Sequence, residues 1–328
     1  MSDENQPDPT VDTTASTNWE RDTLQKLVLA TVREQRASRR WGIFFRLATL
    51  AAVFFVVWAY FDFDFPSLAE EKIGPHTALI EIDGEIDVEG TGAADNVIPS
   101  LNKAFADEGA AAIVLRINSP GGSPVQAGII VDEIKRLRAE YPEKPLYVVV
   151  DEICASGGYY IAAAADRIYV NKASIVGSVG VLMDGFGFTG LMNKLGIERR
   201  LQTAGENKGF MDPFSPQSER HKQYAQEMLN EIHQQFITVV REGRGKRLKE
   251  TPDMFSGLFW TGARAVKMGL ADGFGTVDTV ARDIVKAEDV VDYTQQEGLP
   301  ERVLKRFGAA VGEGAAKTML RTPAPALK

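Results

Sequence analysis

Two long apolar runs, each followed by a pair of glycines and then by a helical pattern, constrain the fold of this chain most. The runs cover 111–117, broken once by Arg116, and 146–150, and the glycine pairs stand at 121–122 and 157–158. Such runs suit parallel strands that are covered on both faces, and a helix supplies the crossover between them. We therefore predict an α/β domain with right-handed crossovers, whose binding loops gather at the carboxyl ends of the strands.

The other elements follow from apolar spacing and helix-end signals. In the first half we expect a strand over 76–82, a helix over 95–108 whose start Pro99 shifts toward 98, and a helix from Pro124 to about 140 with Ser123 as its N-cap. Further strand segments are expected at 168–170 and 174–182. In the second half we expect a long helix over 216–242, a short helix over 260–268 that ends at Gly269, and a helix over 278–287. Apolar residues from Met228 to Val239 predict a packed face on the long helix. After about residue 290 no strong pattern persists.

An apolar segment near the N-terminus predicts a membrane anchor. Residues 41–61 are apolar except for Arg46 and long enough to span a bilayer, and an arginine cluster at 36–40 precedes them. A buried core helix and a cleavable signal are the other interpretations, but the run exceeds a signal's apolar region and no small-residue cleavage pattern follows. The arginines orient the N-terminus toward the cytoplasm and residues 65–328 outside it.

These features divide the chain into four predicted parts. Residues 1–40 are a cytoplasmic tail, largely disordered because its first 20 residues include few large apolar side chains. Residues 41–61 are the transmembrane helix, 65–290 the folded domain and 291–328 a C-terminal tail.

Charge and residue counts exclude several classes of function. The net charge of −8 argues against nucleic acid as a partner, because binding phosphates needs clustered Lys and Arg. The single cysteine, Cys154, allows no intrachain disulfide, and the three histidines are far apart in the sequence. We therefore expect no metal site, and no organic cofactor is implied by the sequence.

The sequence around Ser156 combines a hydroxyl with a sharp strand-to-helix turn. Ser156 directly precedes the second glycine pair, so the backbone can turn and the free N–H groups of a new helix can face the hydroxyl. This layout suits a nucleophile beside an oxyanion site. On this stretch alone, an ordinary helix cap remains the simpler interpretation.

A serine nucleophile needs a base, and the histidines are poor candidates. His76 begins a predicted strand, while His221 and His233 lie on the long predicted helix. A lysine whose proton is loosened by burial is the other option. Lys208 stands in a loop between Gly205 and Gly209, although such a loop lysine is by itself most simply a surface residue.

Four motifs in this order resemble the signal peptide peptidase A family of membrane-bound serine proteases, in its short single-copy form. They are Asn118-Ser-Pro-Gly-Gly122, Ala155-Ser-Gly-Gly-Tyr-Tyr160, Gly177-Ser-Val-Gly180 and the loop around Lys208. The resemblance covers roughly 76–280. It implies a Clp protease/crotonase-like fold of repeated β-β-α units.

The resemblance also implies roles for individual residues. Ser156 would be the nucleophile and Lys208 the general base, with Ser178 orienting the lysine and the N–H groups of Gly122 and Gly157 forming the oxyanion hole. In such short forms the lysine approaches the serine of a neighbouring subunit, so a homo-oligomer is expected. The expected substrates are apolar peptides, such as remnant signal peptides, at the outer face of the cytoplasmic membrane.

Two alternatives belong to other classes. A crotonase-like enzyme acting on acyl-thioesters would share the fold and the paired-glycine oxyanion hole, but it would need an adenine-nucleotide pocket and hardly an outward-facing membrane anchor. A non-catalytic membrane scaffold of the same fold is the third possibility, and the presence of Ser156, Lys208, Ser178 and both glycines argues against it.

Overall fold

The computed structural model describes residues 39–54 and 74–295, and the chain divides into two units, Met1–Glu70 and Glu71–Lys328. In the first unit, residues 39–54 form a helix whose side chains are exposed. Among the described residues, no helix is both long and apolar enough to cross a membrane. The anchor predicted over 41–61 continues past the described part of this helix.

Other predicted parts also lie outside the described residues. These are the N-terminal tail up to residue 38 and the C-terminal tail from 296 onward. The boundary expected after residue 290 falls inside a strand, β8 (Val290–Asp292), which pairs in parallel with β1. This strand is too short to show a pattern in the sequence.

The second unit is built on a mostly parallel sheet whose central strands contain the two apolar runs. The strands follow the order β6-β5-β3-β2-β1-β8, with β4 beside β3 and β7 beside β4. Their bounds are β1 (His76–Asp83), β2 (Ala110–Ser119), β3 (Leu146–Ala155), β4 (Arg167–Val170), β5 (Ile175–Gly177), β6 (Phe259–Thr261) and β7 (Gly273–Phe274). Among the strands of the described residues, only β6 pairs antiparallel, with β5. The predicted α/β class with parallel strands is confirmed.

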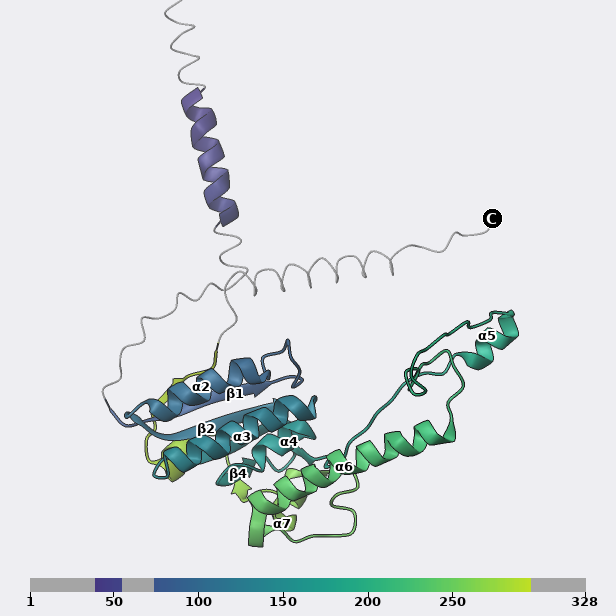
Figure 1. The fold of residues 1–328 in the computed structure, drawn as a ribbon. Helices are drawn as coiled ribbons and strands as arrows, with labels where there is room; N and C mark the ends of the chain where they lie inside the picture. The colour runs from purple at the N-terminus through teal and green to yellow at the C-terminus, as the bar shows by residue number, and fades with distance from the viewer. Residues whose placement is uncertain (1–38, 55–73, 296–328) are drawn as a thin grey trace, which may run out of the picture. The chain divides into compact units, whose positions relative to one another are not determined.

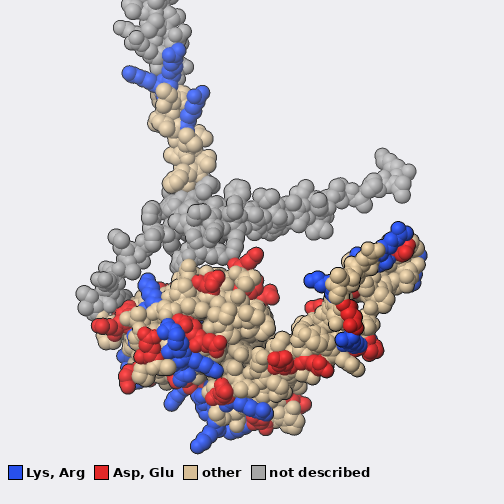
Figure 2. All heavy atoms as spheres, in the orientation of Figure 1, with Lys and Arg blue, Asp and Glu red and all other residues tan. Residues whose placement is uncertain are grey.

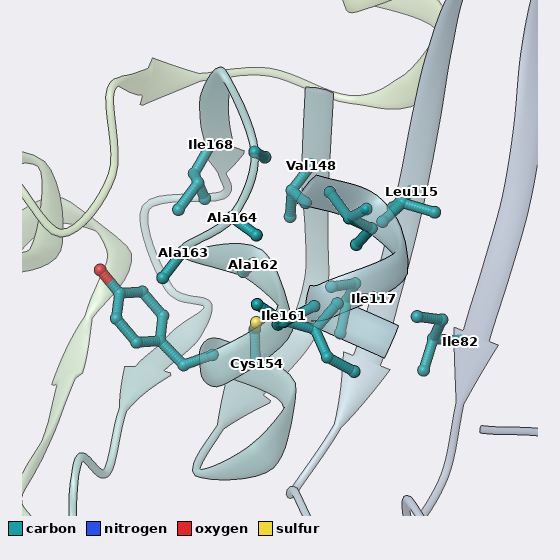
Figure 3. Packing of buried hydrophobic residues seen from close by; sticks show 14 of the residues in the cluster. Ile82, Leu115, Ile117, Val148, Cys154, Ile161, Ala162, Ala163, Ala164 and Ile168 are labelled. Carbon is teal, nitrogen blue, oxygen red and sulfur yellow. The ribbon is translucent and has the colours of Figure 1, made fainter. Parts of the chain in front are cut away.

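Three helices cover one face of the sheet (Figure 1): α2 (Ala94–Ala106), α3 (Pro124–Glu140) and α4 (Gly157–Ala162). Alternate strand residues such as Ile82, Leu115 and Val148 are fully buried beneath them (Figure 3). Each such side chain contributes roughly 1.5–3 kcal/mol of burial free energy. The core therefore fixes the strand ends from which the loops emerge.

The start of α3 is as predicted, and the start of α2 is not. Ser123 caps α3 by accepting a hydrogen bond from the N–H of Gln126, and Pro124 is the first helical residue. The prediction that α2 starts near 98 was wrong, because it begins at Ala94 and contains Pro99. Proline lacks the N–H that would bond the carbonyl of the fourth preceding residue, so α2 forgoes that bond rather than its first turn.

The opposite face of the sheet carries a smaller apolar cluster. Val114, Val149 and Tyr169 are buried there with Val280. Val280 begins a π-helical turn, η2 (Val280–Val285), which follows the single-turn helix α8 (Val277–Thr279). The helix expected over 278–287 is therefore shorter and mixed in type.

The long helix α6 (Glu219–Arg244) is packed only near its C-terminal end. Its buried residues run from Phe236 to Arg244, whereas Met228 is half-buried, so the packed face predicted for this helix is confirmed only in part. The preceding residues, which include α5 (Thr189–Leu195), extend away from the sheet (Figure 1). We call residues 180–218 the arm. No residue in 180–235 is buried.

The short helix after β6 ends as predicted. This helix, α7 (Gly262–Met268), is closed by Gly269 in a left-handed conformation with φ of 75°. Nearby, the buried Arg244 pairs with Asp272 at 2.8 Å between Nη2 and Oδ2. One member of the basic stretch at 241–249 is thus a structural core residue.

The first and last described strands are joined by a polar cluster. His76 Nε2 lies 3.0 Å from the Tyr293 hydroxyl, which donates to Asp107. This hydrogen bond, more than the nearby charges of His76 and Lys144, lowers the pKa of Asp107. The rings of His76 and Tyr293 stack with an interplanar angle of 6°. The beginning of β1 and the residue after β8 therefore lie side by side.

Candidate active site

Ser156 lies at the junction of β3 and α4 in a backbone conformation that amino acids other than glycine rarely adopt. Its φ and ψ are 51° and −121°. Such a conformation costs about 1–3 kcal/mol and persists only where surrounding contacts enforce it. Here the Ser156 N–H donates to Gly177 O and its carbonyl accepts from the Tyr160 N–H, both at 2.9 Å. The half-buried hydroxyl is thus held at the end of the strand.

The loop of Gly121 and Gly122 lies directly against this turn. A Cβ added at Gly121 would come within 2.6 Å of Ser156 Cβ and 2.7 Å of Gly157 N, so no larger residue fits. A Cβ added at Gly157 would lie 3.3 Å from Gly122 N. The structure therefore brings together three residues that are predicted to share a site: Ser156, Gly157 and Gly122.

Two backbone donors at this turn are free. Within the described ranges, neither the N–H of Gly122 nor that of Gly157 donates a hydrogen bond. Gly157 is buried at the first residue of α4, where helix N–H groups have no partner within the helix, and Gly122 is exposed. Two free donors close to one serine can together bind a carbonyl or anionic oxygen. An oxyanion hole requires two such donors aimed at one point.

Ser178 lies beside Ser156 through the pairing of their strands. Ala155 and Gly177 are partners in the ladder of β3 and β5, so the two serines follow at the same level. Ser178 also has a positive φ, of 52°, and its N–H donates to Leu258 O at 2.9 Å. The residue just before the edge strand β6 thus holds the backbone of Ser178 next to the nucleophile candidate.

Lys208 is not brought to the other four residues. It lies in the arm, its side chain is exposed, and in the described part of the chain no hydrogen bond joins it to Ser156 or Ser178. The loop that carries it is held by α6, since Asn207 Oδ1 lies 3.3 Å from His221 Nε2 and Phe210 packs edge-on against the His221 ring. The lysine is therefore presented outward on a structured loop.

The rival groups near Ser156 have other roles. Burial raises the pKa of the Cys154 thiol, which lies within the core cluster below α4 (Figure 3). That side chain packs as a small apolar residue. His233 Nε2 lies 3.1 Å from Val179 O, and no histidine in the described residues bonds Ser156.

The charged side chains of the described residues are mostly paired or interspersed (Figure 2). Among the described residues, no group of three or more His, Cys, Asp or Glu is arranged to hold a metal ion. Figure 2 shows acidic and basic side chains interspersed on the visible face of the second unit. In the basic stretch, Arg241 is paired with Glu250 and Arg247 with Asp272.

Two contributors to the site were missed in the sequence. Ile86 bridges to Gly122, and Leu258 accepts the Ser178 N–H. Both act through backbone atoms, which residue type does not reveal. The only available signal for Ile86 was its place as an apolar residue just after the Asp83-Gly84 turn.

Comparison with known proteins gives a consistent result. The model described as Peptidase family S49 matches residues 138–291. A putative protease of Methanocaldococcus jannaschii, MJ0651, is 33% identical over 228 residues, which cover 66% of this chain and 71% of that protein. A putative signal peptide peptidase SppA of Enterococcus faecium is 29% identical over 199 residues, covering 61% and 57%.

A longer relative shares more identity over a smaller part of its length. The Na(+)/H(+) antiporter NhaA of Brucella melitensis is 44% identical over 213 residues, which cover 65% of this chain but 29% of that protein. Most of that protein therefore lies outside the match.

The fold and the site define an α/β domain in which a strand-end serine faces two free backbone donors. The chain belongs to peptidase family S49. The resemblance to the signal peptide peptidase A family, inferred from the four motifs, is confirmed.

Proposed function

We propose that this protein is a serine endopeptidase in which Ser156 is the nucleophile, the N–H groups of Gly122 and Gly157 stabilise the oxyanion, and Lys208 is the general base. The observation that carries the proposal is the Ser156 turn, where a strained serine is held against two unpaired N–H donors. Each such donor typically contributes about 3–4 kcal/mol to transition-state stabilisation. Family membership supports peptide-bond hydrolysis as the reaction.

In the proposed reaction the lysine removes the serine proton as the hydroxyl oxygen attacks the peptide carbonyl. The carbonyl oxygen becomes an oxyanion between the two N–H groups, and the C–N bond then breaks as the leaving amine takes up the proton. Water hydrolyses the resulting acyl-enzyme. Ser178 would orient Lys208, and the position of Ser178 beside Ser156 supports this role.

We propose that the lysine reaches Ser156 from a neighbouring subunit of a homo-oligomer. The arm supports this, because it presents Lys208 outward and exposes large apolar side chains that include Leu182, Phe186, Leu191, Leu195 and Ile197, at 53–81%. Large exposed apolar patches mark interaction sites, and these side chains all belong to one short segment of the chain. A second copy would cover it and complete the site.

Membrane attachment and substrate class are further proposals. The helix at 39–54 exposes Trp41, Phe44, Phe45 and Phe54, which supports an anchor over 41–61. The arginine cluster at 36–40 favours a peptidase domain outside the cytoplasm. The name of the Enterococcus faecium relative favours remnant signal peptides and other apolar peptides as substrates. An anchored enzyme would share a membrane surface with them.

A fluorophosphonate tests the nucleophile directly. We expect it to form a covalent phosphonyl bond at Ser156 with loss of fluoride, because the tetrahedral adduct places an oxygen between the Gly122 and Gly157 N–H groups. Mass spectrometry of the peptide containing Ser156 measures the adduct, and Ser156→Ala is the control. An unmodified Ser156 in a protein that still hydrolyses peptides contradicts the assignment, and hydrolysis of acyl-thioesters alone favours the crotonase-like alternative.

Gly122→Ala tests the oxyanion hole against a matched substitution. A Cβ at Gly122 would overlap Ile86 O at a φ of 149°, so the N–H must move. We expect kcat for peptide hydrolysis to fall about 10²–10³-fold. At Gly128, in α3, a Cβ meets no atom within 4 Å, so Gly128→Ala should keep kcat and gain up to about 1 kcal/mol of stability. Equal kcat in both variants would remove Gly122 from the site.

A further inference from the structure

We propose that Ile86, in the loop 84–92, is a positioning residue that aims the N–H of Gly122 at the oxyanion. This inference rests on the serine-peptidase function proposed above and names what holds one of its two donors. We call residues 84–92 the Ile86 loop. It contributes no side chain to the chemistry and acts through the backbone of Gly122.

The Ile86 loop forms a one-residue parallel bridge with Gly122. The Ile86 N–H donates to Gly121 O at 2.9 Å, and the Ser123 N–H donates to Ile86 O at 2.7 Å. In a parallel ladder, a residue bonds to the two residues that flank its partner, and the partner's own N–H and C=O point to the opposite side. The bridge therefore turns the Gly122 N–H away from Ile86.

The Gly122 N–H is turned toward Ser156, the proposed nucleophile. A Cβ added at Gly157 would lie 3.3 Å from Gly122 N, and one added at Gly121 would lie 2.6 Å from Ser156 Cβ. Without the bridge, two consecutive glycines would leave the orientation of this N–H undetermined, because glycine populates many backbone conformations. Two hydrogen bonds to one residue remove that freedom.

The Ile86 loop is itself anchored. The Ile86 side chain is fully buried, and a Cβ added at Gly157 would lie 3.6 Å from its Cδ1, so one side chain supports both donors. The loop begins at Gly84, whose N–H donates to Asn118 O, and it leads into α2, whose first residue, Ala94, donates its N–H to Gln126 Oε1 at 2.8 Å. The donor is thus fixed by β2 and α3.

Ser123→Pro and Ser123→Ala form the decisive pair. Both remove the hydroxyl that caps α3, but only proline also removes the N–H that bonds Ile86 O. The native φ of Ser123, −62°, suits proline. We expect kcat in Ser123→Pro to be about tenfold or more below that of Ser123→Ala, with KM changed less than about twofold, because the donor acts on the transition state. Equal kcat values would overturn the proposal.

A second pair covers the case in which the proline variant does not fold. Ile86→Ala and Ile80→Ala each shorten a fully buried isoleucine, at 0% and 1% exposure, and both lose stability. We expect only Ile86→Ala to slow phosphonylation of Ser156 in the folded protein, by about tenfold, and Ile86→Val to restore the rate. Equal rates in the two alanine variants contradict the role of Ile86. A wild-type protein that forms no adduct contradicts the proposed function, and the inference with it.

Discussion

Ser156→Ala should lower kcat for peptide hydrolysis by at least about 10⁴-fold, because loss of the nucleophile removes the acyl-enzyme route while substrate binding and the oxyanion donors remain. The measurement is hydrolysis of an unfolded or apolar peptide by the full chain. The oligomeric assembly, measured as the molecular mass in solution, should not change. Substantial hydrolysis by the alanine variant would show that another group attacks the peptide.

The strained backbone at this position offers a second readout. Glycine accepts a φ of 51° without the steric conflict that a Cβ creates, so Ser156→Gly should be more stable than Ser156→Ala by about 1 kcal/mol, despite the greater flexibility of the unfolded glycine chain. Denaturant unfolding of the two inactive variants measures the difference. An alanine variant as stable as the glycine variant would mean that the turn relaxes once the hydroxyl is gone.

Lys208→Ala should lower kcat by about 10³-fold or more, because the serine hydroxyl then lacks its base. Lys208→Arg should be almost as inactive, since a guanidinium does not give up its proton at physiological pH. Peptide hydrolysis by each variant, with unchanged molecular mass in solution, gives the result. Full activity in either variant would exclude this lysine as the base.

Mixing the two inactive proteins tells where the base comes from. If Lys208 serves a neighbour, an assembly refolded from equal amounts of Ser156→Ala and Lys208→Ala should regain about a quarter of wild-type activity, because half of the subunits have Ser156 and half of their neighbours have Lys208. If the mixture stays as inactive as its components, the lysine and serine of one chain act together.

The sheet and its helices were largely predictable because local signals and burial agree there. The apolar runs at 111–117 and 146–150 became the centres of β2 and β3, and Ser123 and Gly269 cap the helices where expected. β3 was predicted too short. It continues to Ala155 because its second half leaves β4 and pairs with β5, a contact far along the chain that no local pattern encodes.

The site was predictable where it depends on strand ends and not where it depends on distant contacts. Gly122, Gly157, Ser178 and Ser156 gather because parallel strands end at one edge of the sheet. Lys208 does not join them because its loop is part of the arm, none of whose residues is buried. Within the described residues, no packing holds that arm against the strand ends, so the role of Lys208, which the family resemblance implied, stays a prediction.

The cluster of His76, Asp107 and Tyr293 has a consequence for how this domain is carried within a chain. It places the points where the polypeptide enters and leaves the sheet next to each other, on β1 and just after β8. A domain whose first and last strands lie side by side can be inserted into a loop of another protein, or linked to one at either end, without distorting that protein. The fold therefore suits a domain that is inserted into, or fused to, another polypeptide.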